Sequence, residues 1–296
     1  FFDEVLQMSS EVNKAFVQKF RANFIHLSQQ KGSLLRPYVR VNSGVVGKYD
    51  HFDRLGATNA YKITSRHQDT VTVDTPHSRR RVVLEDYAWS DLIDKADKVK
   101  MLADPTSEYM IAGVNAMGRQ MDDLIITAAT GSATSVGSDD STSSVSLPAG
   151  NQIAHGSAGM TLAKLRQARK ILRTNLVDPS EELYCALSAQ AIDDLLAESG
   201  TAITSIDYNA ERPMVMGFPK FFMGFTIIHS ERLAIASNIR TCFAWAKSGI
   251  GLSIGMDVTT RISERDDKLY STQAYACISL GSTRVEDEKV VSIGVD

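Results

Sequence analysis

The sequence has few of the residues that frame a disulfide-bonded or metal-binding protein. It contains only three cysteines, Cys185, Cys242 and Cys277, an odd number at wide spacing. We therefore expect buried thiols in a reducing compartment, with the cytoplasm as the default, and no disulfide framework. The six histidines form no H-x-H or H-x-x-x-H pair and none lies near a cysteine in the sequence, which argues against a metal site.

Long hydrophobic runs are also missing. No stretch approaches the roughly 18 consecutive apolar residues that a membrane helix needs, so we expect no membrane partner. The first segment, FFDEVLQMSSEVNKAF, carries Asp3 and Glu4 and a helix-like pattern, which argues against a secretory signal. The 296 residues, of which 43% are hydrophobic and 23% charged, suffice for one sizeable core or two smaller ones in a soluble globular protein.

Catalytic motifs are incomplete. The run GLSIG at 251–255 matches the G-x-S-x-G nucleophile elbow with Ser253 as the nucleophile, but the histidine of that fold follows the serine, and the last histidine here is His229. We interpret those glycines as a turn or bulge between strands. The run GVVGK at 44–48 is two residues short of a P-loop. The sequence therefore predicts no catalytic residue and no cofactor.

Adjacent acidic pairs give no metal or catalytic site either. Neighbouring positions on a helix point about 100° apart, so two such carboxylates cannot jointly bind an ion. We interpret each pair as part of a solvated face. The pairs are Asp122–Asp123, Asp139–Asp140, Asp193–Asp194 and Asp266–Asp267.

Charge is unevenly distributed along the chain. Residues 36–81 carry nine basic and four acidic side chains, a net charge of +5, within a chain whose total is −3. Since the first 35 residues carry +1, residues 82–296 carry −9. A basic segment in an acidic protein can contact nucleic acid, lie on an acidic surface of the same or a neighbouring subunit, or simply be solvated. For the run RRR at 79–81, without interleaved aromatic residues, we favour a protein interface over nucleic acid.

The N-terminal quarter of the chain changes from helical to β-type patterning. Apolar residues at helical spacing predict an amphipathic helix within 3–30. Residues 37–75 contain the β-type runs YVRVNSG, NAYKITSR and TVTVDTP, and in the last run Val71 and Val73 alternate with polar residues as in a half-exposed strand. Because this region has few large aliphatic residues, we expect a long twisted hairpin that needs another surface to lie on.

A long helix and a polar tract follow the return of the chain to a packed body over 81–103. Asp104 is the expected N-cap and Pro105 the first helical residue. Residues Glu108, Asn115, Arg119 and Asp122 fall on the side opposite a single apolar seam. The Gly/Ser-rich tract 130–159 predicts a loop or a weak exposed hairpin. The seam consists of Met110, Val114, Met117, Met121, Leu124 and Ala128.

The remainder of the chain predicts a compact α/β or α+β body. Thr161 is placed to cap a helix over LAKLRQARKILRTNL, and AQAIDDLLAES predicts a second helix. The runs ELYCALS, FFMGFTIIHS and RTCFAWAK predict strands. The chain ends in the strand-like stretch LYSTQAYACISLGSTRVEDEKVVSIGVD.

Three stretches in this order resemble one family over nearly the whole chain. They are SRRRVVLEDYAWSDLIDKADKVKMLADPTSEYMIAGVNAMGRQMDDLIITAAT, then KFFMGFTIIHSERL, then TCFAWAKSGIGLSIGMDVTTRI with DDKLYSTQAYACISLGSTRVEDEKVVSI. The first is similar to the strand leaving the extended loop, the connector and the spine helix of tailed-bacteriophage major capsid proteins. The others are similar to a strand of their axial domain and to their closing strands. The family has the Hong Kong 97 fold, and the pattern resembles its podovirus-type members.

The resemblance implies an α+β fold with four parts. Residues 1–36 would be an N-terminal arm and 37–80 an extended loop. Residues 81–158 and 270–296 would form a peripheral domain that includes a spine helix at 105–129, and 159–269 an axial α/β domain.

The resemblance also implies a function. The chain would be a structural major capsid protein, not an enzyme, that self-assembles as hexamers and pentamers into an icosahedral phage head enclosing double-stranded DNA. It would assemble in the host bacterial cytoplasm and reside in the virion capsid. Implied partners are further copies of itself, a scaffolding protein, a portal and a decoration or cement protein. Packaged DNA would be contacted only non-specifically.

Subunit-interface residues follow from the same resemblance. The extended loop would overlap an adjacent subunit through arginines, and the N-terminal arm would add apolar contacts. Two alternatives stay open: an encapsulin-like nanocompartment shell, which needs an internal groove for a cargo tail, and a soluble enzyme with an enclosed pocket. The interface candidates are Arg54, Arg66, Arg79, Arg80, Arg81, Phe16, Phe20 and Phe24.

Overall fold

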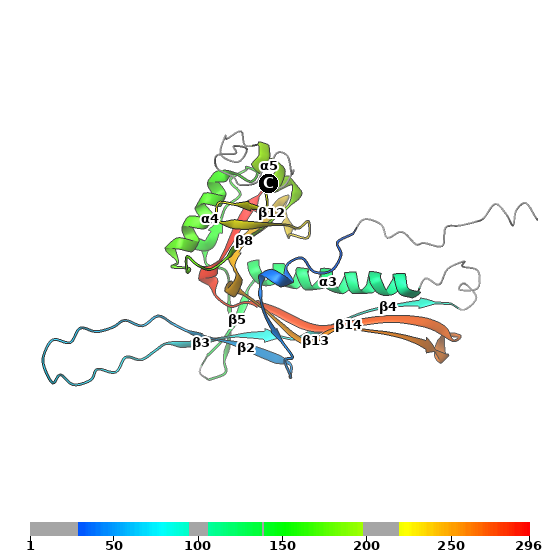
Figure 1. Cartoon of the computed structure of the whole chain (residues 1–296), viewed down its shortest axis with the longest axis horizontal. Helices are drawn as coiled ribbons and strands as arrows, with labels where there is room; N and C mark the ends of the chain where they lie inside the picture. Colours follow the sequence, from blue (N-terminus) through cyan, green and yellow to red (C-terminus); the bar gives the residue numbers. More distant parts are fainter. Residues whose placement is uncertain (1–28, 95–105, 138, 198–218) are drawn as a thin grey trace, which may run out of the picture.

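The computed structural model describes residues 29–94, 106–137, 139–197 and 219–296. Within these ranges the chain forms three sheets and three helices, which confirms the predicted α+β class. Figure 1 shows an elongated molecule with an upper part, a long helix above a lower sheet, and a hairpin that projects away from both. None of the described helices is long and apolar enough to cross a membrane.

The lower part is a four-stranded sheet with one long helix along it (Figure 1). The order is β1-β13-β14-β4, with β1 parallel to β13 and the other pairs antiparallel. Helix α3 (Thr106–Thr130) approaches the sheet closely at Gly113, where a Cβ atom would lie 2.5 Å from the Trp89 ring. The strands are β1 (Arg40–Ser43), β4 (Glu85–Ile93), β13 (Ile250–Arg265) and β14 (Ser271–Arg284).

The upper part is a seven-stranded mixed sheet of order β7-β15-β12-β8-β10-β9, with β11 paired to β12. Helix α4 (Leu162–Thr174) begins as predicted, because the Thr161 hydroxyl accepts from Lys164 N–H, and helix α5 spans Ala189–Ala197. Strand β8 is buried along its whole length, as its uninterrupted apolar sequence requires. The strands are β7 (Gln152–Ile153), β8 (Leu183–Leu187), β9 (Phe221–Phe222), β10 (Phe225–His229), β11 (Ile235–Ala236), β12 (Ile239–Ala246) and β15 (Val290–Val295).

The third sheet contains the projecting hairpin and has the order β2-β3-β5-β6. Strands β5 and β6 lie in the Gly/Ser-rich tract, so the predicted weak hairpin is confirmed, but it also pairs with β3 and buries Ala133 and Val136. The strands are β2 (Tyr49–Leu55), β3 (His77–Val83), β5 (Ala133–Val136) and β6 (Thr142–Val145). Single 3₁₀ turns occur at Arg36–Tyr38, Ala149–Asn151, Lys247–Gly249, Asp266–Lys268 and Asp287–Lys289.

One continuous hydrophobic core joins the upper and lower parts. It includes Met121 of α3, Ile278 of β14 and Trp245 of β12, each almost completely buried. The Trp245 Nε1–H donates to Tyr38 O at 2.9 Å, and the Tyr38 ring lies 4.9 Å from that of Tyr184. A small second cluster of Phe52, Val82 and Val285 lies under the hairpin base. The base of the hairpin is therefore packed against the body, but the hairpin has no core of its own.

Helix α3 buries more than the predicted single seam. Met117 and Met121 are buried as expected, but Val114 is 37% exposed. On the supposedly polar side, Asn115 and Asp122 are buried. The prediction was wrong there because hydrophobic periodicity does not detect a face covered by a polar segment of backbone.

Two strand-level predictions have different outcomes. The strand predicted around Val71 and Val73 is wrong: residues 56–76 form no strand in the single chain, because no neighbouring strand pairs with them. The glycines of 251–255, predicted to form a turn or bulge between strands, lie within the single strand β13, and the bulge is confirmed by the register shift of β13 against β14 between Ile254 and Met256.

Strand pairing crosses the predicted domain boundary at residue 270. That boundary falls between β13 and β14, which pair along most of their length, while β15 joins the upper sheet. These pairings do not by themselves define domains, so the division into arm, loop, peripheral and axial domains stays a prediction. The helix predicted within 3–30, the Asp104 cap and Pro105 lie outside the described residues.

Candidate assembly interface

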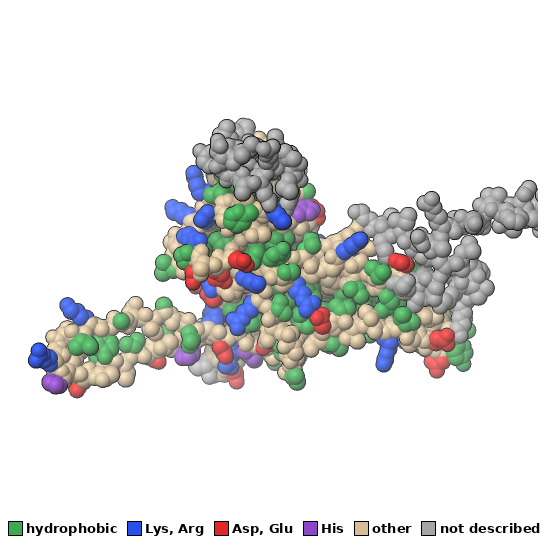
Figure 2. Space-filling model, viewed as in Figure 1, with side chains coloured by type: hydrophobic (Ala, Val, Ile, Leu, Met, Phe, Trp, Pro, Cys, Tyr) green, Lys and Arg blue, Asp and Glu red, His purple; other side chains and the backbone are tan. Residues whose placement is uncertain are grey.

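The connection between β2 and β3 extends away from the body without a partner strand. Residues 56–76 stand clear of the rest of the molecule in Figure 2. The loop closes where Gly56 N–H donates to Pro76 O at 2.8 Å. Beyond that point, the side chain of Ile63 is 72% exposed and that of Val71 is 50% exposed. Apolar side chains gathered on an isolated loop are typical of a surface that another chain covers.

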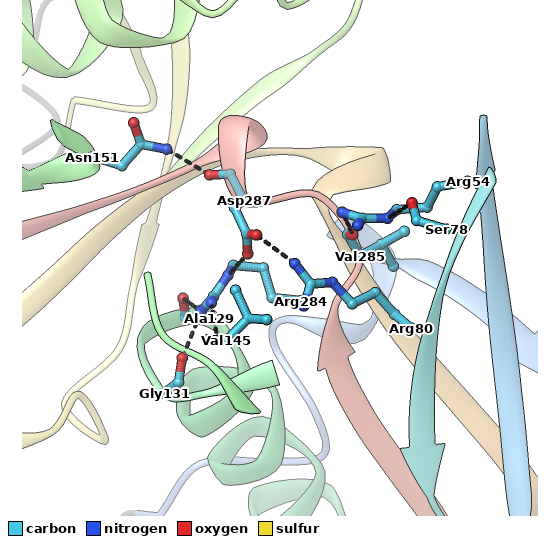
Figure 3. A network of polar contacts seen from close by, with 10 residues as sticks. All are labelled: Arg54, Ser78, Arg80, Ala129, Gly131, Val145, Asn151, Arg284, Val285 and Asp287. Atoms are coloured by element: carbon cyan, nitrogen blue, oxygen red, sulfur yellow. Dashed lines mark hydrogen bonds and ion pairs between the residues drawn. The ribbon is translucent and has the colours of Figure 1, made fainter. Parts of the chain in front are cut away.

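The base of the hairpin is fixed to the body by a buried ionic junction (Figure 3). Arg284 at the end of β14 is fully buried, and its Nε donates to Asp287 Oδ1 at 2.6 Å. Its Nη1 donates to Gly131 O at 2.5 Å and its Nη2 to Val145 O at 3.0 Å. One guanidinium thus connects the lower sheet to the end of α3 and to strand β6, which a fork of several donors makes possible.

Arg80 reaches the same carboxylate from the hairpin strand β3 (Figure 3). Its side chain is 2% exposed, and its Nη2 pairs with Asp287 Oδ2. Burial lowers the pKa of Arg80, and the positive charges of Arg54 and Arg284 act in the same direction against the attraction of Asp287. Its Nε and Nη1 find no hydrogen-bond partner in the described part of the chain. Two buried guanidiniums therefore depend on one carboxylate.

Further polar contacts complete the junction. The Arg54 Nη1 donates to Val285 O at 3.0 Å, and its Nε donates to Ser78 Oγ at 3.1 Å on the facing strand. Asn151 Nδ2 donates to the backbone oxygen of Asp287 at 2.6 Å. These contacts hold the turn that carries Asp287 between the hairpin and the upper part.

Two of the arginines predicted to lie at the subunit interface instead make contacts within their own chain. Arg80 is buried inside its own chain and Arg54 is half-buried against Val285, so neither presents a free guanidinium to a neighbour. Sequence reasoning treated the run at 79–81 as one surface, but alternate residues of a strand point to opposite faces.

The other predicted residues lie nearer to solvent. Arg79 is exposed and pairs with Asp53 at 2.5 Å on the facing strand, and its hydrogen bond lowers the pKa of that carboxyl. The Arg81 guanidinium lies 4.6 Å from the centre of the Tyr49 ring. Arg66 lies exposed in the loop. Phe16, Phe20 and Phe24 lie outside the described residues.

A clamp on α3, which sequence reasoning missed, holds residues 30–35. The Asp122 carboxylate is fully buried and accepts from Leu34 N–H at 2.9 Å and Leu35 N–H at 3.1 Å. It also accepts from the side chains of Gln30 and Ser33. The interpretation of Asp122 as part of a solvated face is wrong, because a segment distant in sequence supplies hydrogen-bond donors to its carboxylate.

The same face of α3 adds three more members to this clamp. Asn115 Oδ1 accepts from Gly32 N–H at 3.1 Å, and Arg119 Nη1 donates to Gln30 O at 3.2 Å. At Gly118 a Cβ atom would collide with the backbone of Gly32. A glycine inside a helix, between polar residues at helical spacing, is the sequence signal that could have indicated this contact.

Ser253, the formal match to a nucleophile elbow, lies within strand β13, near its start. It is fully buried, and its hydroxyl donates to Asp50 Oδ2 at 2.5 Å. A nucleophile elbow places its serine exposed on a sharp strand-to-helix turn. The position of Ser253 therefore gives it a structural contact and not the geometry of that motif.

Comparison with known proteins gives a consistent result. A family model described as phage capsid protein matches residues 12–296. No curated protein matches the chain significantly. Among solved structures, the capsid of cyanophage P-SCSP1u aligns with a TM-score of 0.72 and 17% identity, covering 95% of this chain and 93% of that one.

Two further capsid structures align over almost the full length of both chains. The capsid asymmetric unit of cyanophage Pam1 has a TM-score of 0.73 and 12% identity, covering 100% of this chain and 99% of that one. The acid-stable capsid of Helicobacter pylori bacteriophage KHP30 has a TM-score of 0.72 and 11% identity, with the same coverage. At such low identity the likeness to these structures demonstrates the fold.

Proposed function

Because the chain belongs to the phage capsid protein family, and is therefore a structural capsid protein, we propose that it closes into an icosahedral phage head as hexamers and pentamers. The head encloses double-stranded DNA, assembles in the host bacterial cytoplasm and becomes the capsid of the virion. The single observation that supports this most strongly is the hairpin. The 21-residue loop at 56–76 is closed at its base by the Gly56–Pro76 hydrogen bond and pairs with no strand beyond it. A hairpin of this length without a core is stabilised when a second chain covers it.

The residues that we propose to contact the adjacent subunit differ in part from the interface arginines predicted from the sequence. Arg54 and Arg80 hold the hairpin at the required angle from inside, and the loop itself contacts the adjacent subunit. Lys62 and Arg66 are its exposed cations, and Ile63, Val71 and Val73 its exposed apolar side chains. The cations would fix the register on an acidic neighbour, while the apolar side chains supply the buried area.

The remaining parts take the roles that the family implies. The upper part, with its seven-stranded sheet, is proposed as the axial domain that meets its counterparts at the capsomer centre. Residues 30–35 of the proposed N-terminal arm are held by the clamp around Asp122. A scaffolding protein, a portal and a decoration or cement protein are proposed partners, as for other shells assembled around a packaged genome.

The alternatives receive less support. An encapsulin-like compartment has the same architecture, but the family model and the three structures named above are those of phage capsids. A soluble enzyme would need a reactive group, and the one sequence motif that suggested it, around Ser253, has a buried hydroxyl bonded to Asp50.

Size-exclusion chromatography followed by negative-stain electron microscopy of the expressed chain, alone and with its scaffolding partner, tests this function. We expect closed shells, or hexamers and pentamers eluting far ahead of a 32.4 kDa monomer. A folded monomer that stays monomeric under both conditions would contradict the proposal.

A further inference from the structure

Helix α4 carries an unusual concentration of positive charge for its place in the chain. It contains five basic residues and no acidic one, although residues 82–296 together carry −9. Lys164 is buried and donates to backbone carbonyls that include His155 O at 2.7 Å and Gly294 O at 3.0 Å. Figure 2 shows lysine and arginine side chains gathered on the surface over α4. The four basic residues besides Lys164 are Arg166, Arg169, Lys170 and Arg173, and we call them the α4 basic face.

The four side chains form one stripe. Their spacing of i, i+3, i+4 and i+7 places them along one side of the helix over about 10 Å. Arg169 Nη1 donates to Met223 O at 2.6 Å and Arg173 Nη1 to Val177 O at 3.3 Å, which orients two guanidiniums without neutralising them. Arg166 and Lys170 are exposed. None of the four makes an ion pair with a carboxylate in the described part of the chain.

Five arginines elsewhere in the described structure have carboxylate partners, whereas none of the four residues of the α4 basic face has one. This contrast indicates that the α4 basic face is left uncompensated in the single chain, as a surface for an external anion would be. The pairs are Arg36–Asp257, Arg79–Asp53, Arg232–Asp123, Arg240–Glu231 and Arg265–Asp267.

We propose that the α4 basic face contacts the phosphate backbone of DNA enclosed by the shell, so that the α4 side of the upper part faces the interior. The inference rests on the proposed function, because it takes enclosed DNA as the polyanion. Duplex DNA presents one negative charge per about 1.7 Å of axis, so a stripe of four cations about 10 Å long matches several phosphates. Contacts to phosphate carry no sequence information, so we expect the contact to be independent of DNA sequence.

Binding of a random-sequence 30-base-pair duplex to the unassembled full-length chain, measured by fluorescence anisotropy at several salt concentrations, tests the inference. The test variant is Arg166→Glu with Lys170→Glu. The matched control is Arg261→Glu with Lys268→Glu, which makes the same change in net charge at two exposed positions of the lower part. We expect the test variant to lose at least tenfold in affinity at low salt and the slope of log affinity against log salt to fall by about two. The control should change by less than about threefold.

Each result decides the matter. Equal losses in both variants, unchanged binding in the test variant, or no binding by the wild-type chain would overturn the inference. If the test variant binds DNA normally but no longer forms shells, the α4 basic face is an interface between copies instead. Failure of the proposed function is distinguishable, because it appears as absence of wild-type shells in the microscope whatever the DNA titration gives.

Discussion

Asp287 is the residue on which the position of the hairpin depends most. Its carboxylate takes both buried guanidiniums, Arg284 from the lower sheet and Arg80 from the hairpin. Removing the partner of a buried charge lowers the free energy of unfolding far more than replacing the whole pair by apolar groups. Substitutions at Asp287, Arg284 and Arg80 should therefore differ in their effect on stability.

Asp287→Asn is therefore expected to destabilise the chain by about 3–5 kcal/mol, because two buried guanidiniums lose their counter-charge. Arg80→Met should cost distinctly less, since Arg284 then keeps Asp287 to itself and the unsatisfied Nε and Nη1 disappear. Urea unfolding of the unassembled chain measures both. Equal losses in the two variants would show that the shared carboxylate is not the critical element.

Glu231 is a second residue with an individual, pH-dependent effect. Burial works to raise its pKa, but hydrogen bonds from Ala189 N–H, from Arg240 and from His229 overcome it and lower the pKa to about 2. The Ala189 contact lies at the first residue of α5, so the carboxylate supports the start of that helix.

Because the folded-state pKa of Glu231 lies below the ordinary value of 4.5, its contribution to stability is present above about pH 4.5 and is lost as the pH falls toward 2. We expect Glu231→Gln to lower the urea midpoint at pH 5 and to leave it close to wild type at pH 2. The carboxylate is about half exposed, so solvent screening keeps the difference small. Parallel curves for the two proteins across this range would contradict the assignment.

At the scale of elements, α3 is organised by two different surfaces. One face packs on the sheet through Trp89 and Gly113, and the other clamps residues 30–35 through Asn115, Arg119 and Asp122. The helix therefore contacts both the lower sheet and residues 30–35. On the face that contacts residues 30–35, Gly118 leaves no room for a side chain, because the backbone of Gly32 lies directly against it.

Gly118→Ala should release the clamp, because its Cβ atom would collide with the backbone of Gly32 and not with a flexible side chain. We expect faster hydrogen exchange at the amides of Leu34 and Leu35, whose N–H groups bond to Asp122. Gly150→Ala is the matched control, since nothing lies within 4 Å of a Cβ atom there. Unchanged exchange in Gly118→Ala would mean that the backbone approach is not tight.

Element-scale patterns also explain how much the sequence could predict. The α3 and α4 helices, the Thr161 cap, strand β8 and the bulge in β13 follow from local periodicity and turn chemistry, and the structure confirms them. The parallel pairing of β1 with β13, the buried Asp122 and the inward Arg80 depend on contacts 87 or more positions apart, which no local pattern contains. The strand predicted at 70–74 is wrong for a related reason: no strand in the described part of the chain pairs with these residues.

At the scale of the whole molecule, the shape itself argues for assembly. A continuous core holds the upper and lower parts together, while the hairpin loop at 56–76 extends beyond that core with exposed apolar residues (Figure 1). The described residues of this loop contribute nothing to the core clusters, which supports the proposal that the loop acts between chains. The proposal that the loop contacts an adjacent subunit is the central claim.

The most direct test removes the loop and leaves the body intact. Gly56 N–H already donates to Pro76 O across the hairpin, so Asn-Gly in place of residues 57–75 closes it with a tight turn, provided that Pro76→Thr supplies the N–H that the turn needs at its last position. Negative-stain electron microscopy then compares the shortened and wild-type chains, with the thermal midpoint of each as the check on folding. We predict closed shells for the wild type and none for the shortened chain, at closely similar thermal midpoints. Closed shells from the shortened chain would contradict the account.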